Sequence, residues 1–513
     1  MKYTQWLCLL WVLICCPIAA QVDTVRIAIN ADQGIDTINR HIYGHFAEHL
    51  GRCIYGGFYV GEDNQVIANT DGVRNDIVDA LKALKIPNLR WPGGCFADTY
   101  HWKDGIGPKS QRPTIVNRWW GGTTEDNSFG THDFLNLCEI LDTEPYLSAN
   151  VGSGTVQELI DWVQYTNHGG RSPMADVRRS NGRDEPWGVT YWGVGNETWG
   201  CGGNMTVEYY ANIYRQYATF MPGWSSGKEI VRIASGASSS DYHWTEVLMR
   251  DVPHKLMEAV ALHHYSVIDW SNKGPDINFS DDQYFTIIEN ALHMEELITR
   301  HSTIMDKYDP EKKVALFVDE WGAWYDGEEN KGVLYQQNTM RDAMVAGSTL
   351  NIFNNHADRV KMANIAQTVN VLQAVVLTDE EKMILTPTYH VMQMYAVHQH
   401  ALQLPIHIDN TNYEHNGHSL PAVNVSASTD REGKTHISIV NIDLEQSRPL
   451  VIHIGGEELG DGSANILQSE NINDHNSFDQ PNRIHPRDFT EFVISEDQIE
   501  LTIPPFSLVV LEL

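Results

Sequence analysis

Short apolar runs alternate with amphipathic helical segments through most of this sequence, and no other feature constrains the fold as strongly. Segments 76–85 (DIVDALKALK), 131–141 (THDFLNLCEIL) and 156–166 (VQELIDWVQYT) repeat apolar residues at helical spacing. The strand-like runs are residues 42–46, 88–91, 145–149, 191–195, 233–236, 260–264, 315–319 and 362–366. This series predicts an α/β fold, a (β/α)8 TIM barrel over residues 41–398. A doubly wound open sheet is the alternative, but we find no Gly-rich dinucleotide fingerprint.

The pattern changes near residue 400. The runs HISIVNID (436–443), PLVIHIG (449–455) and SLVVLEL (507–513) are short, alternate apolar with polar residues, and are separated by turn-forming residues. They predict an appended antiparallel β-sandwich, jelly-roll-like, over residues 399–513. The run VDTVRIAIN (22–30) has the same character, so residues 21–40 are expected to add one or more strands to this sandwich.

The N-terminus has the features of an export signal. Lys2 precedes an apolar run over residues 6–18, and Ala19 and Ala20 supply the small residues of a cleavage site. The run is too short to span roughly 30 Å of hydrocarbon. A lipoprotein signal at Cys15 or Cys16 is the alternative, but the residues before them lack the small side chain of a lipidation site. We therefore expect residues 1–20 to be a signal peptide and the protein to be periplasmic or extracellular.

Charge and cysteine usage exclude several classes of function. The chain has 36 basic and 67 acidic residues, a net charge of −31, which opposes binding to nucleic acid. We find no membrane-spanning run after the signal. The cysteines beyond it, Cys53, Cys95, Cys138 and Cys201, form no C-x-x-C pair, so a structural zinc site is not expected. One disulfide is allowed, but buried free thiols are the default expectation.

Polar residues cluster where the barrel strands are expected to end. In a TIM barrel, side chains at the C-terminal ends of the strands converge on one pocket. The residues at these positions are Glu48, Arg90, the WPGGCF turn with Cys95, Asn196, Glu197, His263, Tyr265, Glu320 and Gln367. This set makes the C-terminal face of the barrel the candidate active site.

Two glutamates stand out in this set. Glu197 in WGVGNETWG and Glu320 in LFVDEWGAW each follow an apolar strand directly. Glycoside hydrolysis uses such a pair, because one carboxylic acid protonates the leaving oxygen while the other attacks the anomeric carbon or activates water. A helix-capping or ion-pairing role explains one isolated glutamate, but two at matching strand ends favour catalysis.

Strand alternation decides between neighbouring candidates. If Val314, Leu316 and Val318 fill the barrel, Glu320 shares their face and Asp319 points toward the helices. The same rule puts His263 and its neighbour at 264 on opposite faces, so this pair is not expected to bind one metal. A ligand-orienting role and a buried core histidine are both open for His263.

Several blocks resemble one known family. They are GHFAEHLGRCIYGG (44–57), LRWPGGCFADTYHWKDGIGP (89–108), GVGNE (193–197), LHHY (262–265), DEWGAWY (319–325) and HADRVKMANIAQTVNV (356–371). Together they resemble glycoside hydrolase family 51, whose members are chiefly α-L-arabinofuranosidases. The resemblance extends from about residue 40 to 395, and the EHLGR and HADRV blocks are its most specific parts.

The resemblance implies a role for each site residue. Glu197 would be the acid/base and Glu320 the nucleophile of a retaining reaction that needs no metal or organic cofactor. The residues implied to bind the sugar or orient groups around it are Glu48, Cys95, Asn196, His263, Tyr265 and Gln367, and Arg90 would fix a carboxylate from behind. Many family members have Asn where this chain has Cys95, so only a backbone contact to the sugar is expected there. Because Cys53 and Cys201 flank other pocket motifs, a disulfide or an oxidation-sensitive thiol near the site is a further alternative.

The expected reaction is exo-hydrolysis of terminal α-L-arabinofuranosyl units from arabinan, arabinoxylan or their oligosaccharides. The resemblance also implies a homo-oligomer. An endo-acting β-glucanase or xylanase on the same barrel is one alternative, and a non-catalytic carbohydrate-binding protein is another.

Overall fold

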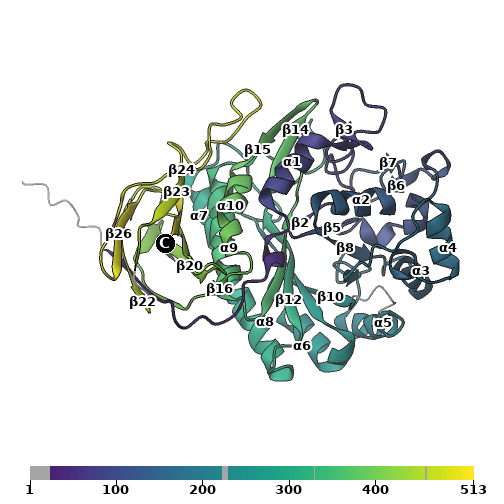
Figure 1. The fold of residues 1–513 in the computed structure, drawn as a ribbon, viewed down its shortest axis with the longest axis horizontal. Helices are drawn as coiled ribbons and strands as arrows, with labels where there is room; N and C mark the ends of the chain where they lie inside the picture. Colours follow the sequence, from purple (N-terminus) through teal and green to yellow (C-terminus); the bar gives the residue numbers. More distant parts are fainter. Residues whose placement is uncertain (1–23, 222–228, 329, 457–458) are drawn as a thin grey trace, which may run out of the picture.

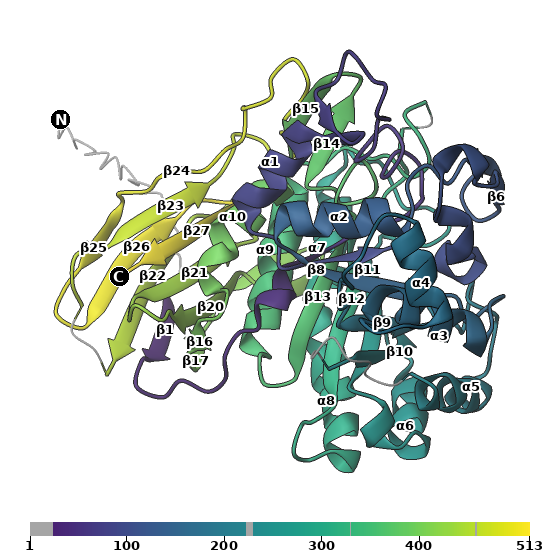
Figure 2. The same ribbon diagram turned by 45° about the vertical axis from the view of Figure 1, so that its right-hand side comes forward.

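The computed structural model describes residues 24–221, 229–328, 330–456 and 459–513. Eight parallel strands close into a barrel (Figures 1 and 2). In chain order they are β2 (Gly44–Phe46), β5 (Asn88–Trp91), β8 (Glu144–Ala149), β9 (Tyr191–Val194), β10 (Val231–Ser238), β11 (Ala259–Ser266), β12 (Ala315–Ala323) and β13 (Val360–Ala366). The predicted TIM barrel is confirmed.

Amphipathic helices surround the barrel. Helix α1 buries Ile77, Leu81 and Leu84 on one face, and the Ser280 side chain caps α7 by accepting from the Gln283 backbone N–H. The helices are α1 (Asn75–Leu84), α2 (Thr131–Leu141), α3 (Val156–Asn167), α4 (Pro173–Ser180), α5 (Val207–Thr219), α6 (Tyr242–Asp251), α7 (Asp281–Leu292), α8 (Met294–Tyr308), α9 (Met340–Asn355) and α10 (Pro387–Tyr395). No helix in the part of the chain described here is both long and apolar enough to cross a membrane.

The C-terminal strands form two sheets beside the barrel, at the yellow end of the chain in Figure 1. One sheet contains β17 (Ile406–Asp409), β1 (Val25–Asn30), β22 (Arg448–Gly455), β26 (Gln498–Ile503) and β25 (Phe492–Ile494). The other contains β16 (Leu402–Gln403), β20 (Val423–Thr429), β21 (Thr435–Asn441), β27 (Ser507–Glu512), β23 (Ser463–Leu467) and β24 (Arg487–Asp488). Pairing is antiparallel except between β1 and β22. The predicted antiparallel β-domain is confirmed, and the N-terminal strand β1 lies inside one of its sheets.

The described residues also form four short hairpins and several 3₁₀ turns. The hairpins pair β3 (Asn69–Thr70) with β4 (Val73–Arg74), β6 (Ile115–Asn117) with β7 (Thr123–Glu125), β14 (Val376–Asp379) with β15 (Lys382–Leu385), and β18 (Asn412–His415) with β19 (His418–Pro421). The turns are Arg40–Tyr43, Ala97–Thr99, Trp102–Gly105, Lys109–Gln111, His254–Leu256 and Ala396–His398.

The interior of the barrel corrects one expectation about β12. Phe317, not Leu316 or Val318, packs with Tyr146 and Met362 inside the barrel, while Leu316 and Val318 join the core under the helices. The faces assigned from the sequence were therefore reversed, and simple alternation would now point Asp319 inward and Glu320 outward.

A β-bulge in β12 moves Glu320 into the site. Ala261 pairs with Phe317 but His263 pairs with Glu320, and on the other side Val318 pairs with Ala363 but Trp321 with Ile365. Strand β12 thus has one extra residue relative to β11 between Phe317 and Glu320, and one relative to β13 between Val318 and Trp321. A bulge of this kind re-aims side chains, and here Asp319 and Glu320 both reach the site at the barrel mouth.

Candidate active site

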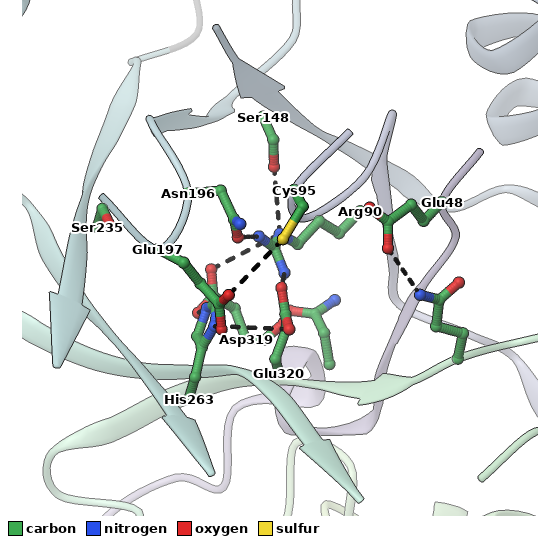
Figure 3. A network of polar contacts seen from close by, with 12 residues as sticks. Glu48, Arg90, Cys95, Ser148, Asn196, Glu197, Ser235, His263, Asp319 and Glu320 are labelled. Atoms are coloured by element: carbon green, nitrogen blue, oxygen red, sulfur yellow. Dashed lines mark hydrogen bonds and ion pairs between the residues drawn. The ribbon is translucent and has the colours of Figure 1, made fainter. Parts of the chain in front are cut away.

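The site lies at the C-terminal ends of the barrel strands. Figure 3 shows the carboxylates of Glu197 and Glu320 converging with the His263 ring, while Glu48 lies on the opposite side of Arg90. A cavity of about 680 Å³ opens on the Glu197 side. Its walls include the aromatic side chains Trp199, Tyr265, Trp270 and Trp324 and the polar residues Ser238, Ser239, His264, Asn290 and His293.

Glu197 sits at a sharp turn directly after β9. Its φ of 41° is left-handed, and the backbone N–H of Asn196 just before it donates to Asp98 Oδ2 at 3.1 Å. Its Oε1 lies 3.0 Å from His263 Nδ1. Burial raises the pKa of Glu197, and the nearby Glu320 carboxylate adds to this rise against the lowering effect of the His263 hydrogen bond. Glu197 therefore keeps its proton above the pH at which an ordinary carboxyl loses it.

Both oxygens of Glu320 accept hydrogen bonds from buried side chains. Arg90 Nη1 donates to its Oε1 at 2.8 Å, and the Tyr265 hydroxyl donates to its Oε2 at 2.9 Å. The buried Arg90 guanidinium is fixed in turn, because it donates to Asn196 Oδ1 at 2.6 Å and to Ser148 Oγ at 3.2 Å. Charge-assisted hydrogen bonds of this kind stabilise the ionised form of a carboxyl.

Glu197 and Glu320 lie close together, but their surroundings differ. One oxygen of Glu197, one of Glu320 and one ring nitrogen of His263 all lie within 4.8 Å of one another. Glu197 is in an environment that favours its acid form, and Glu320 receives donors that favour its anion. A carboxyl whose burial favours its acid form, beside a second carboxyl that receives hydrogen bonds from Arg90 and Tyr265, is suited to act as the acid next to a nucleophile.

A third acidic group, Glu48, lies on the far side of Arg90. Its Oε1 accepts from the backbone N–H of Phe96 at 3.0 Å and from Trp120 Nε1 at 2.9 Å, and its Oε2 accepts from Gln367 Nε2 at 3.0 Å. Burial first, and then the charge of Glu320, raise the pKa of Glu48 to about 7.

The WPGGCF turn requires its two glycines, because acidic side chains of the site lie too close to leave room for a Cβ atom. A Cβ at Gly93 would lie 2.6 Å from Glu48 Cγ, and one at Gly94 would lie 2.9 Å from Glu320 Oε1. A side chain at either position would displace an acidic group of the site.

Cys95 and Cys201 correct the expectation of free thiols. They form a disulfide that joins the turn after β5 to the turn after β9, and Cys201 Sγ lies 3.5 Å from Glu197 Oε2. Cys53 and Cys138 are buried free cysteines, as expected. The bonded pair is separated by 106 positions, so only the meeting of two strand ends in the barrel brings it together.

The structure thus gathers every residue singled out from the sequence around one centre, but three further members were missed. Strand alternation predicts that Asp319 points toward the helices, but it contacts His263 and Tyr146 in the site. Trp120 comes from the loop between β6 and β7, for which no periodic signal exists. Asp98 stands in the WPGGCFAD block, where its hydrogen bonds to the backbone of residues 151, 152 and 196 could not be inferred.

His263 and His264 point to opposite sides, as strand alternation required. His263 faces Glu197 and Asp319, whereas His264 approaches Ser239 and the carbonyl of Asn290.

The site atoms that could bind a metal ion already contact other groups of the protein. The cluster of Glu197, His263 and Glu320 has the compactness of a cation site, but Arg90 and Tyr265 occupy the oxygens of Glu320, and the Arg90 guanidinium would repel a cation. Cys95 and Cys201 offer no thiolate because they are joined.

Comparison with known proteins places this geometry in context. Two family profiles match the chain, an "Alpha-L-arabinofuranosidase 1 domain" over residues 80–281 and an "Alpha-L-arabinofuranosidase C-terminal domain" over residues 319–507. A relative from Bacteroides ovatus, named an intracellular exo-alpha-L-arabinofuranosidase, is 51% identical over 494 residues, covering 96% of each chain.

Solved structures agree with the profiles. The GH51 arabinofuranosidase of Xanthomonas axonopodis pv. citri is 45% identical with a TM-score of 0.93, over 95% of this chain and 99% of that one. The alpha-L-arabinofuranosidase of Thermotoga maritima, solved as an arabinose complex, is 30% identical with a TM-score of 0.84, over 96% and 100%.

These comparisons correct the expected location. A relative that is 51% identical over nearly the full length of both chains is named intracellular, which contradicts export. The proposed signal, residues 1–20, lies outside the described residues. A short apolar run with small residues after it marks a hydrophobic segment, and that composition was not sufficient to identify an export signal.

Proposed function

Because this chain belongs to the α-L-arabinofuranosidases of glycoside hydrolase family 51, and so is a glycoside hydrolase, we propose that it removes terminal non-reducing α-L-arabinofuranosyl residues with retention of configuration. Arabinan, arabinoxylan and their oligosaccharides are the proposed substrates. Membership of this family sets aside the alternative of a non-catalytic binding protein.

The observation that carries the proposal is the pairing of Glu197 with Glu320. Their nearest carboxylate oxygens lie within 4.8 Å of each other. Retaining glycosidases hold their two carboxyl groups roughly 5–5.5 Å apart, whereas inverting enzymes need roughly 6.5–9.5 Å to admit a water. The short separation supports a direct attack on the sugar by one carboxylate.

The contacts support Glu197 as acid/base and Glu320 as nucleophile. In the first step Glu320 bonds to the anomeric carbon while the C–O bond to the leaving group breaks and the Glu197 proton passes to the departing oxygen. In the second step Glu197, now ionised, takes a proton from water. The water oxygen then bonds to the anomeric carbon and Glu320 leaves.

The surroundings of the pair support a single sugar ring on one side and a glycan on the other. Glu48, Asn196, Tyr265 and Gln367 are proposed to hydrogen-bond the arabinofuranosyl hydroxyls, with the backbone N–H of Cys95 as a further donor. Arg90 and His263 are proposed to orient the two glutamates.

The leaving group is proposed to lie in the cavity on the Glu197 side. Its walls carry Trp199, Trp270 and Trp324, and sugar rings pack their C–H faces on aromatic rings. An aromatic wall next to the proton donor supports a carbohydrate leaving group.

The test is hydrolysis of 4-nitrophenyl α-L-arabinofuranoside and of α-1,5-linked arabino-oligosaccharides, with proton NMR recording the anomer released first. We expect the α-anomer first and stepwise release of arabinose from the non-reducing end. Glu320→Ala should reduce turnover to background, whereas Glu311→Gln, an exposed control on the same chain, should leave it unchanged. Initial release of the β-anomer, or cleavage of internal bonds of xylan or β-glucan, would refute the proposal.

A further inference from the structure

A fourth acidic group of the site, Asp319, takes no part in the two displacement steps. Only 2% of its surface is exposed. The Tyr146 hydroxyl donates to its Oδ2 at 2.6 Å, and Arg90 Nε lies 3.8 Å from the same oxygen. Its other oxygen, Oδ1, lies 3.1 Å from His263 Nε2.

The His263 ring lies between this carboxylate and the catalytic pair. Its Nε2 faces Asp319, while its Nδ1 lies 3.0 Å from Glu197 Oε1 and 3.5 Å from Glu320 Oε2. A neutral imidazole has only one N–H donor. A ring that donates from Nδ1 to Glu197 and forms an ion pair through Nε2 with Asp319 must therefore carry protons on both nitrogens.

The charges of the cluster agree with a doubly protonated ring. Asp319 and Glu320 carry two negative charges, and Arg90 with a protonated His263 balances them when Glu197 is neutral. Burial alone would lower the pKa of His263, but the carboxylates of Glu320 and Asp319 raise it to about 10.

We propose that Asp319 is a positioning residue for the acid/base, holding the His263 ring so that its Nδ1–H donates to Oε1 of Glu197 and leaves Oε2 directed at the leaving group. This inference rests on the proposed role of Glu197. The bulge in β12 is what turns Asp319 and Glu320 into the same site, so one strand supplies both the nucleophile and the anchor of the acid/base.

The hydrogen bond from His263 to Glu197 becomes stronger during the reaction. As the proton leaves Glu197 for the departing oxygen, Glu197 becomes an anion and its hydrogen bond from His263 becomes an ion pair. An interaction that strengthens in the transition state accelerates the chemical step. This hydrogen bond accelerates the reaction most when the leaving oxygen needs the proton of Glu197, and least when the leaving group departs readily as an anion.

The test compares leaving groups, using kcat/KM because it reports the glycosylation step. Asp319→Asn should lower kcat/KM at least about 100-fold on an α-1,5-linked arabinotriose and less than about tenfold on 4-nitrophenyl α-L-arabinofuranoside. Glu197→Gln should show the same dependence on leaving group, and the double variant should lose little more than Glu197→Gln alone. Equal losses on both substrates, or no loss, would overturn the proposal.

A matched control separates positioning from stability. Asp309 is also buried and paired with an arginine, since its Oδ2 lies 3.0 Å from Arg359 Nη1, but it precedes β12 at the opposite end of the strand. Asp309→Asn should lower stability and leave the ratio of kcat/KM between the two substrates unchanged. If Glu197→Gln itself shows no dependence on leaving group, the assignment of the acid/base fails rather than the role of Asp319.

A measurement on the unaltered protein keeps the proposal testable if Asp319→Asn does not fold. Nitrogen-15 NMR of histidine-labelled protein at neutral pH should show His263 with protons on both ring nitrogens, assigned by its absence in His263→Gln. A His263 signal with an unprotonated Nδ1 would refute the proposed hydrogen bond to Glu197.

Discussion

Replacing Glu48 by glutamine is expected to stabilise the protein at neutral pH while weakening its function. The pKa of Glu48 is raised from 4.5 to about 7 in the folded state, so between these pH values the native state binds a proton that the unfolded state has released. Stability from this group is fully present below pH 4.5 and is lost as pH rises through about 7. Each pH unit between the two values corresponds to about 1.36 kcal/mol, so the total loss is about 3 kcal/mol.

The substitution Glu48→Gln removes this loss without removing the hydrogen bonds. An amide oxygen can accept from the backbone of Phe96 and from Trp120 as Glu48 Oε1 does. Gln367 Oε1 accepts no hydrogen bond from the described residues, so a flip of the Gln367 amide lets it accept from the new amide. The variant should therefore gain about 3 kcal/mol relative to the parent between pH 4 and pH 8.

The assay is urea unfolding followed by tryptophan fluorescence at several pH values, with kcat/KM measured in parallel. Glu432→Gln, at an exposed turn, is the control for replacing a glutamate by glutamine. We expect the stability difference for Glu48→Gln to grow as pH rises, together with a loss of kcat/KM because a proposed sugar-binding acid is gone. A difference that stays constant or shrinks would show that Glu48 is ionised in the native protein, and the reasoning would be wrong.

Three other outcomes are expected. Because burial raises the pKa of Glu197 above its ordinary value of 4.5, kcat/KM should fall with rising pH along a limb above that value, and a pH profile of Glu197→Gln on an activated aryl substrate should lack the limb. Alkylation of the unfolded protein without reductant, followed by peptide mass spectrometry, should leave Cys95 and Cys201 unmodified, and labelling of either would disprove their bond. Phe317→Ala should lower the unfolding free energy by about 3–5 kcal/mol in urea titrations, because Phe317 fills the barrel interior. The exposed Val493→Ala should change it by no more than about 0.5 kcal/mol, and a Phe317→Ala effect as small as this would contradict the packing.

The sequence by itself determined the architecture and the principal members of the site. Hydrophobic periodicity is a local property, so the eight barrel strands and the helical segments at 76–85, 131–141 and 156–166 could be located from their own residues. The barrel rule then placed Glu197 and Glu320 at the same end of the barrel, because C-terminal ends of parallel strands converge wherever eight such units close. Glu48 and Gln367 followed from the same rule.

Only the tertiary structure decided how those residues meet. Asp319 and Glu320 both reach the site because of a bulge, which is an excess of one residue relative to two neighbouring strands and has no signature within β12 alone. The bond between Cys95 and Cys201 and the reach of Trp120 to Glu48 depend on loops whose paths follow no period. Residue type and spacing along one strand are local, whereas register, loop path and the pKa of a buried acid arise from contacts between segments far apart in the chain.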